Sequence, residues 1–266
     1  MTPEAAGRAP GWLLGFARLA AGLLVGPAGA HAAASDTLIA SGQSVTFGGA
    51  VQGGAAENLD WIHQDPEHEL IGLGVTHQQL ADTQLAIARL TGSLNISSAN
   101  SLAGTLEAGP GTEGTSHYTF TRVTVDGTRA VTGAFQVTGG GQYVEADQAR
   151  TLMLRMRTVW LPAGRVSLQA QLGQSIGGNL PTRFVSLRAD YVRRVQLYAG
   201  FAVGEGAQAV IELGPVSYQR FTDALVGIAV PLSRCTIGLT WDRLALDFLI
   251  RRTVSLSITV PIRRHA

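Results

Sequence analysis

The sequence predicts an all-β fold, in the form of a single antiparallel transmembrane β-barrel. From Thr151 onward, apolar and polar residues alternate with period 2, which is typical of strands that have one apolar and one polar face. Small and hydroxylated residues dominate the polar face, as they do in a water-filled lumen. Short and long connections between the expected strands alternate, as in barrels whose turns are short on one side of the membrane.

The composition limits the alternatives. The chain has 266 residues, of which only 15% are charged, against a usual level of about 25%. Its 20 basic residues, all arginine, and 19 acidic residues give a net charge of +1, so we expect no nucleic-acid partner. After the N-terminus, no run approaches the roughly 18 apolar residues of a spanning helix, which excludes an α-helical membrane protein.

The N-terminus, residues 1–34, predicts a signal peptide. Arg8 and Arg18 precede an apolar stretch, and a series of small residues follows it, with cleavage expected after Ala32 or Ala34. The alternative is an uncleaved anchoring helix. The single cysteine, Cys235, cannot form an internal disulfide.

The clearest strands lie in the second half of the chain. Residues 165–172, 235–242 and 252–260 alternate without interruption. In the last of these, Val254, Leu256 and the following apolar residues occupy one face, and serines and threonines occupy the other. Residues 184–191 and 195–203 follow the same pattern.

The connections between these strands give a second argument. We expect long connections at residues 139–150, 173–182, 204–219 and 243–251, and short ones at 126–129, 161–164, 192–194 and 231–234. This alternation indicates short periplasmic turns and longer extracellular loops, and it places the C-terminus in the periplasm. A secreted soluble β-sandwich with loops clustered at one end is the architectural alternative.

The N-terminal third predicts less regular elements. Residues 69–77 and 101–107 fit strands, whereas residues 80–90 fit either a short helix or an irregular strand. Because bacterial single-chain barrels have even strand numbers, we expect 12 strands, with 14 as the alternative. The expected barrel covers residues 58–262. Residues 35–57 form an N-terminal periplasmic segment or a first strand, and residues 263–266 form a C-terminal tail.

A signal peptide followed by alternating strands, with short turns such as Leu161-Pro162-Ala163-Gly164, resembles the bacterial outer-membrane β-barrel superfamily. Strands at residues 183–191 and 195–203 resemble YaiO-type barrels, which are associated with exopolysaccharide systems. The resemblance implies location in the outer membrane, contact with outer-membrane lipid and insertion by the barrel-assembly machinery. One departure is the last strand, which ends with Val260-Pro261-Ile262 where such barrels usually carry an aromatic residue.

Charge is unevenly divided along the chain. Residues 33–140 hold 3 arginines and 10 acids, whereas residues 141–266 hold 15 arginines and 8 acids. We expect the two halves to form opposing charged walls across a lumen. Arg155, Arg157 and Arg188 fall on the polar face of their strands and are the lumen-lining candidates, together with Asp190, which is a candidate partner of Arg188. Arginines that line a pore favour anions.

Three aromatic residues lie near strand ends on apolar faces. Trp160, Tyr191 and Trp241 are therefore candidates for the interfacial aromatic girdle of a barrel, with packing in a soluble core as the alternative.

These patterns predict a pore for passage or export of a polar or anionic solute, such as a saccharide linked to exopolysaccharide. We expect no cofactor, no catalytic residue and no metal site, because the acids and histidines of residues 63–69 match the spacing of no tight metal centre. The alternatives are a non-conducting structural or binding barrel in the cell envelope and an outer-membrane hydrolase.

Overall fold

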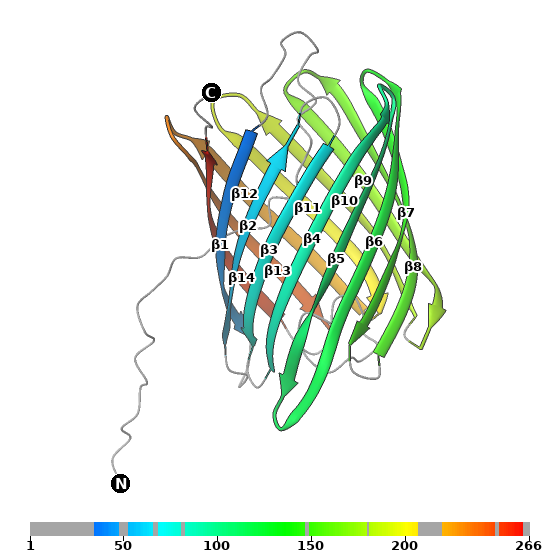
Figure 1. The fold of residues 1–266 in the computed structure, drawn as a ribbon, viewed down its shortest axis with the longest axis vertical. Helices are drawn as coiled ribbons and strands as arrows, with labels where there is room; N and C mark the ends of the chain where they lie inside the picture. Colours follow the sequence, from blue (N-terminus) through cyan, green and yellow to red (C-terminus); the bar gives the residue numbers. More distant parts are fainter. Residues whose placement is uncertain are drawn as a thin grey trace.

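The computed structural model describes residues 35–47, 53–65, 69–80, 83–146, 149–179, 181–206, 220–247 and 250–262. The expected signal peptide and C-terminal tail lie outside these residues. The described chain forms fourteen strands, each antiparallel to its neighbours, and the sheet closes where β1 pairs with β14 (Figure 1). The predicted antiparallel barrel is confirmed with the alternative strand number, and the preferred number of 12 was wrong.

The strands follow one another around the barrel in chain order. They are β1 (Ser35–Phe47), β2 (Gly54–Gln64), β3 (Glu69–Leu80), β4 (Thr83–Ser97), β5 (Asn100–Glu113), β6 (Ser116–Thr132), β7 (Phe135–Ala146), β8 (Ala149–Ala163), β9 (Val166–Gly178), β10 (Thr182–Val192), β11 (Gln196–Gly206), β12 (Arg220–Pro231), β13 (Thr236–Leu246) and β14 (Ile250–Ile262).

Alternation along each strand divides the residues between the two faces of the sheet. In β8, Leu152, Leu154 and Met156 are 42%, 52% and 44% exposed on the outer face, whereas Thr151 and Met153 are buried on the inner face. Large apolar residues are exposed in the same way on most other strands. Closure pairs the backbone groups of every strand, and the apolar outer face then suits contact with hydrocarbon. Within the described ranges, no helix is long and apolar enough to cross a membrane.

Two expected connections are strands in the structure. Residues 126–129, expected as a turn, lie inside β6, and most of residues 139–150, expected as a long loop, lie inside β7. Aspartate and glycine are ordinary turn signals, but here Asp126 and Gly140 are register partners within β6 and β7, and both lie on the inner face of the sheet. A Cβ atom on Gly140 would lie 2.0 Å from the Oδ1 atom of Asp126, so the glycine leaves the space that this aspartate occupies. Gly140 therefore marks close approach of a side chain to the sheet.

The N-terminal third also differs from expectation. Residues 83–90, expected as part of a helix or an irregular strand, belong to the regular strand β4. The barrel begins at Ser35 with β1, and the expected boundary at residue 58 lies within β2. The outer face of β1 carries Ala40, Gly42 and Ser44, which are too small or too polar to produce an apolar alternation.

The expected alternation of loop lengths is largely absent, because the strands extend further than the sequence suggested. β9 continues to Gly178 and β14 begins at Ile250, which leaves short connections in both places. The longest gap between strands is residues 207–219, which lie outside the described residues. The strand ends that flank it, Gly206 and Arg220, lie at the end of the barrel opposite Ser35 and Ile262. We name the two ends by the orientation expected from the sequence, so the end at Ile262 is called the periplasmic end and the opposite end the extracellular end.

Candidate functional site

The barrel interior contains acidic and basic side chains that alternate around the sheet. They lie on the strand face opposite the exposed apolar residues. The acids are Asp60, Glu107, Asp126, Asp190, Asp223 and Asp242, and the arginines are Arg89, Arg122, Arg155, Arg157, Arg188 and Arg251. Both signs occur in each half of the described barrel, so the expected opposing charged walls are not found. The surplus arginines of the second half lie on the outer face or in turns, as Arg165, Arg183 and Arg220 do.

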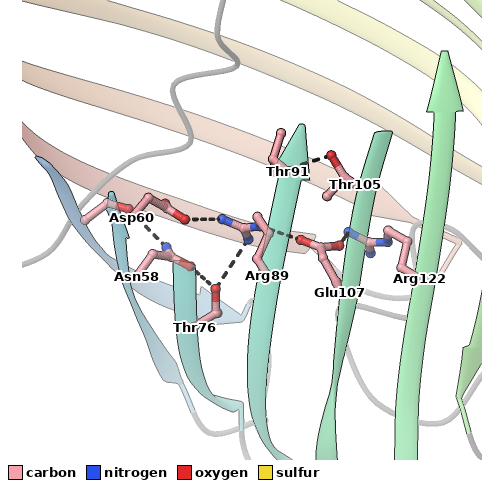
Figure 2. A network of polar contacts seen from close by, with 9 residues as sticks. Asn58, Asp60, Thr76, Arg89, Thr91, Thr105, Glu107 and Arg122 are labelled. Atoms are coloured by element: carbon pink, nitrogen blue, oxygen red, sulfur yellow. Dashed lines mark hydrogen bonds and ion pairs between the residues drawn. The ribbon is translucent and has the colours of Figure 1, made fainter. Parts of the chain in front are cut away.

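Four of these side chains form a continuous ion-pair ladder across β2, β4, β5 and β6 (Figure 2). Arg89 donates from Nη1 to Asp60 Oδ1 at 2.8 Å and from Nε to Glu107 Oε1 at 2.7 Å. Arg122 Nη1 donates to the other oxygen of Glu107 at 2.9 Å. The Glu107 side chain is only 6% exposed, so both of its oxygens depend on these arginines. The ladder consists of Asp60, Arg89, Glu107 and Arg122.

Neutral polar groups surround the ladder. The Thr76 hydroxyl donates to Asn58 Oδ1 at 2.6 Å, and the Asn58 amide donates to the Ser41 hydroxyl at 3.0 Å. Arg89 Nη2 also reaches the Thr76 hydroxyl, at 3.4 Å (Figure 2). A cation held by two carboxylates and a hydroxyl has little capacity left for a passing solute.

Glycines allow the longest contacts of the interior. Asp60 pairs in register with Gly74, and Gly74 pairs with Arg89, so the Asp60 side chain crosses the glycine to reach the arginine two strands away. The same arrangement recurs with Asp126, Gly140 and Arg155, where Arg155 Nη2 donates to Asp126 Oδ2 at 2.9 Å. The sequence intervals are 14 and 15 residues in both sets. Sequence analysis missed this pattern, although the repeated spacing of acid, glycine and arginine is visible in the sequence.

The predicted lumen-lining residues differ in what they contact. Arg155 is held by Asp126, as described. Arg188 Nη2 donates to Asp190 Oδ1 at 2.7 Å, and its guanidinium carbon lies 4.7 Å from the centroid of the Tyr198 ring. Asp190 also accepts from the amide of Gln196 at 3.2 Å.

Arg157 is different. Within the described part of the chain its side chain makes no hydrogen bond or ion pair, and its Nε atom is buried without an acceptor. The rest of the side chain is only partly buried, so its Nη donors remain accessible from the barrel interior. Among the predicted arginines, Arg157 therefore has the greatest capacity for an anion.

Arg157 lines a cavity of about 360 Å³ inside the barrel. The cavity follows a row of residues in register from β8 to β14. The row consists of Arg157, Gln171, Ser186, Ala202, Asp223, Leu244 and Arg251. Ser186 and Ala202, with Gly200 beside them, have short side chains, so the middle of the row is hollow and the longer side chains stand at its ends. Gln169, Phe184, Arg188 and Phe221 also line the cavity.

The ladder side of the barrel is more tightly filled. Its cavity measures about 70 Å³ and is lined by Arg89, Glu107 and Arg122, with Arg251 shared between the two cavities. A buried apolar cluster adjoins it on the inner face, formed by Leu85, Phe120, Val144 and Ala146. The Arg122 guanidinium carbon lies 5.2 Å from the centroid of the Phe120 ring. The available space therefore lies mainly beside β8 to β12.

The aromatic candidates are all exposed on the outer face. Trp160 (51% exposed) and Tyr191 (39%) lie near the periplasmic ends of β8 and β10. Trp241 (39%) lies in the middle of β13 and not near a strand end as expected, because the strand continues past residue 242 to Leu246. Arg243 follows it on the outer face.

Several solved structures have a similar fold. The CymD monoaromatic hydrocarbon channel has a TM-score of 0.63 at 9% identity, covering 89% of this chain and 90% of that chain. The Pseudomonas putida toluene transporter TodX has a TM-score of 0.52 at 9% identity, covering 86% and 88%. A bacterial polysaccharide outer membrane secretin has a TM-score of 0.52 at 10% identity, covering 88% and 100%. No protein-family model and no curated protein matches the sequence.

The chain therefore has the fold of bacterial outer-membrane β-barrels. The apolar outer face and the closed sheet assign it to the outer membrane, because a closed barrel leaves no unpaired strand edge in lipid.

Proposed function

We propose that the protein is an outer-membrane pore for passage or export of a polar or anionic solute, and that the solute is a saccharide with acidic groups, of the kind found in exopolysaccharides. The observation that carries this proposal is Arg157, a cation without a partner in the described chain, which faces the larger interior cavity. An arginine in this state can accept a carboxylate through two parallel hydrogen bonds.

The rest of the cavity supports a saccharide. The amides of Gln169 and Gln171 and the hydroxyl of Ser186 can exchange hydrogen bonds with sugar hydroxyls. Phe184 and Phe221 add apolar surface for the faces of sugar rings. Similar folds include proteins described as a hydrocarbon channel and as a polysaccharide secretin, so the fold leaves the cargo open. The charged interior of this chain favours the polar cargo over a hydrocarbon.

The proposal can be tested in planar bilayers. We expect the purified protein to conduct, to prefer anions under a salt gradient, and to be blocked by an oligogalacturonate more strongly than by a neutral maltooligosaccharide of equal length. Arg157→Gln should weaken the block by about tenfold or more, because a hydrogen bond to a charged group contributes about 1.5–3 kcal/mol.

The matched control is the double variant Asp126→Asn with Arg155→Gln. It removes an interior arginine two residues from Arg157 but leaves the net charge unchanged, because its partner is neutralised too. We expect it to retain the oligogalacturonate block. Equal block of the Arg157→Gln channel and the native channel would refute the role of Arg157.

A non-conducting binding barrel is the second candidate. The filled ladder side and the apolar cluster of Leu85, Phe120, Val144 and Ala146 favour a narrow interior. Absence of conductance from correctly folded protein, with oligogalacturonate still bound, would select this candidate. Neither candidate includes a catalytic step.

A further inference from the structure

Val226, Trp241 and Val254 are register partners on the outer face of β12, β13 and β14 and form a row of large, exposed apolar residues. The next outward-facing row toward the extracellular end consists of Ala224, Arg243 and Arg252. Beyond it, the outer faces of β13 and β14 carry Ala245 and Ile250, and then both strands end. The two arginines therefore stand one row from the strand ends, near the boundary between the hydrocarbon and the lipid headgroups.

Arg243 and Arg252 face each other directly across β13 and β14. Like charges directly opposite on one face of a sheet destabilise it. Neither side chain makes a hydrogen bond or ion pair within the described residues. Their further neighbours on this face, Ala224, Ala245, Ile250 and Thr46, offer no negative charge.

Other outward-facing arginines at the extracellular end have an acid as register partner. Arg150 pairs in register with Glu145, and Arg183 pairs with Glu205, with which it forms an ion pair. The Arg243–Arg252 pair departs from this arrangement, and a bound anion would remove the repulsion.

We propose that Arg243 and Arg252 form a binding site for the phosphate group of a glycolipid in the outer leaflet. Two guanidinium groups side by side can hold one phosphate through several charge-assisted hydrogen bonds. The acyl chains of the same lipid would lie along Trp241 and Val254, which are exposed immediately below the pair. This contact with the adjoining apolar band favours a lipid phosphate over free inorganic phosphate.

The test uses the full chain purified in neutral detergent and diphosphoryl lipid A as the probe, with native mass spectrometry to measure retained lipid. We expect the variant Arg243→Gln with Arg252→Gln to retain lipid A with about tenfold lower affinity, as expected for loss of charge-assisted hydrogen bonds. The matched control is Arg150→Gln with Arg183→Gln, which removes two outward arginines that face acids. It should bind within about twofold of the native chain.

Three outcomes would overturn the proposal. The first is that the Arg243→Gln, Arg252→Gln variant retains lipid A as well as the native chain does. The second is that the native chain retains dephosphorylated lipid A equally well. The third is that millimolar inorganic phosphate displaces lipid A. If the double glutamine variant fails to fold, Arg243→Lys with Arg252→Lys keeps both charges. It should keep measurable lipid A binding, weaker than that of the native chain, because lysine cannot form the paired hydrogen bonds of arginine. Binding of the lysine variant equal to that of the native chain would contradict the guanidinium geometry.

Discussion

The two sides of the barrel interior use arginine in different ways. On the ladder side, from β2 to β6, Arg89 and Arg122 share Glu107, and Arg89 also reaches Asp60. On the cavity side, from β8 to β12, Arg157 has no partner in the described chain and faces the larger cavity. The ladder links neighbouring strands, whereas the donors of Arg157 have no acceptor in the described chain, which is why we propose that they bind a solute. An inward-facing arginine is therefore structural or functional according to what its neighbouring strands present to it.

The largest effect on stability is expected from removing the carboxylate of Glu107, which Arg89 and Arg122 share in the ladder. Glu107→Gln leaves Arg89 and Arg122 without the buried charge that they share, and we expect unfolding free energy to fall by about 3 kcal/mol, at the lower end of values for a broken buried pair. The midpoint of the heat-modifiable gel shift, or of urea unfolding, measures the change. Glu113→Gln, in the same strand at its end, is the control and should be close to neutral. An equal response of both variants would mean that the ladder contributes nothing specific.

The glycines beneath the long ion pairs give a smaller effect. In Gly140→Ala the new Cβ would lie 2.0 Å from Asp126 Oδ1 and 2.3 Å from the Val125 carbonyl oxygen, so the contact of Asp126 with Arg155 must shift. We expect a loss of about 1–3 kcal/mol, as for other overpacked sites.

Gly139→Ala provides a matched control one residue away. No other heavy atom lies within 4 Å of its added Cβ on the outer face. This variant should be neutral or stabilising by roughly 0.5 kcal/mol, since glycine is costly within a strand. Should Gly140→Ala prove as stable as Gly139→Ala, the glycine would not be needed for the ion pair. Urea unfolding in detergent distinguishes the two.

The smallest effect on stability is expected for Arg157, on the cavity side of the interior. Arg157→Gln removes no contact within the described chain, so we expect the unfolding free energy to change by less than about 0.5 kcal/mol while the oligogalacturonate block is weakened. Urea unfolding and bilayer recording on the same preparation separate the two quantities. A stability loss comparable to that of Glu107→Gln would show that Arg157 is part of the structural network.

Much of the fold follows from local patterns. Alternation in residues 165–172 and 252–260 predicts strands, and the short connections expected at 161–164 and 231–234 overlap the short connections of the structure at 164–165 and 232–235. The strand number was underestimated because β1 has a weak apolar face. The glycines of β7 resemble a loop, which misplaced the bounds of β6 and β7. In both places a local rule about residue preference competed with packing against neighbouring strands, and packing determined the result.

Local sequence is sufficient to assign each residue to one face of its strand, because side chains alternate along an extended chain. That is enough to predict an apolar exterior and to place Arg155, Arg157 and Arg188 on the opposite side from their apolar neighbours. Contacts between strands required the folded barrel: Asp126 reaches Arg155 over Gly140, Arg157 faces a cavity, and Arg243 lies beside Arg252. These contacts depend on the register between strands, which is set cooperatively by closure of the whole sheet.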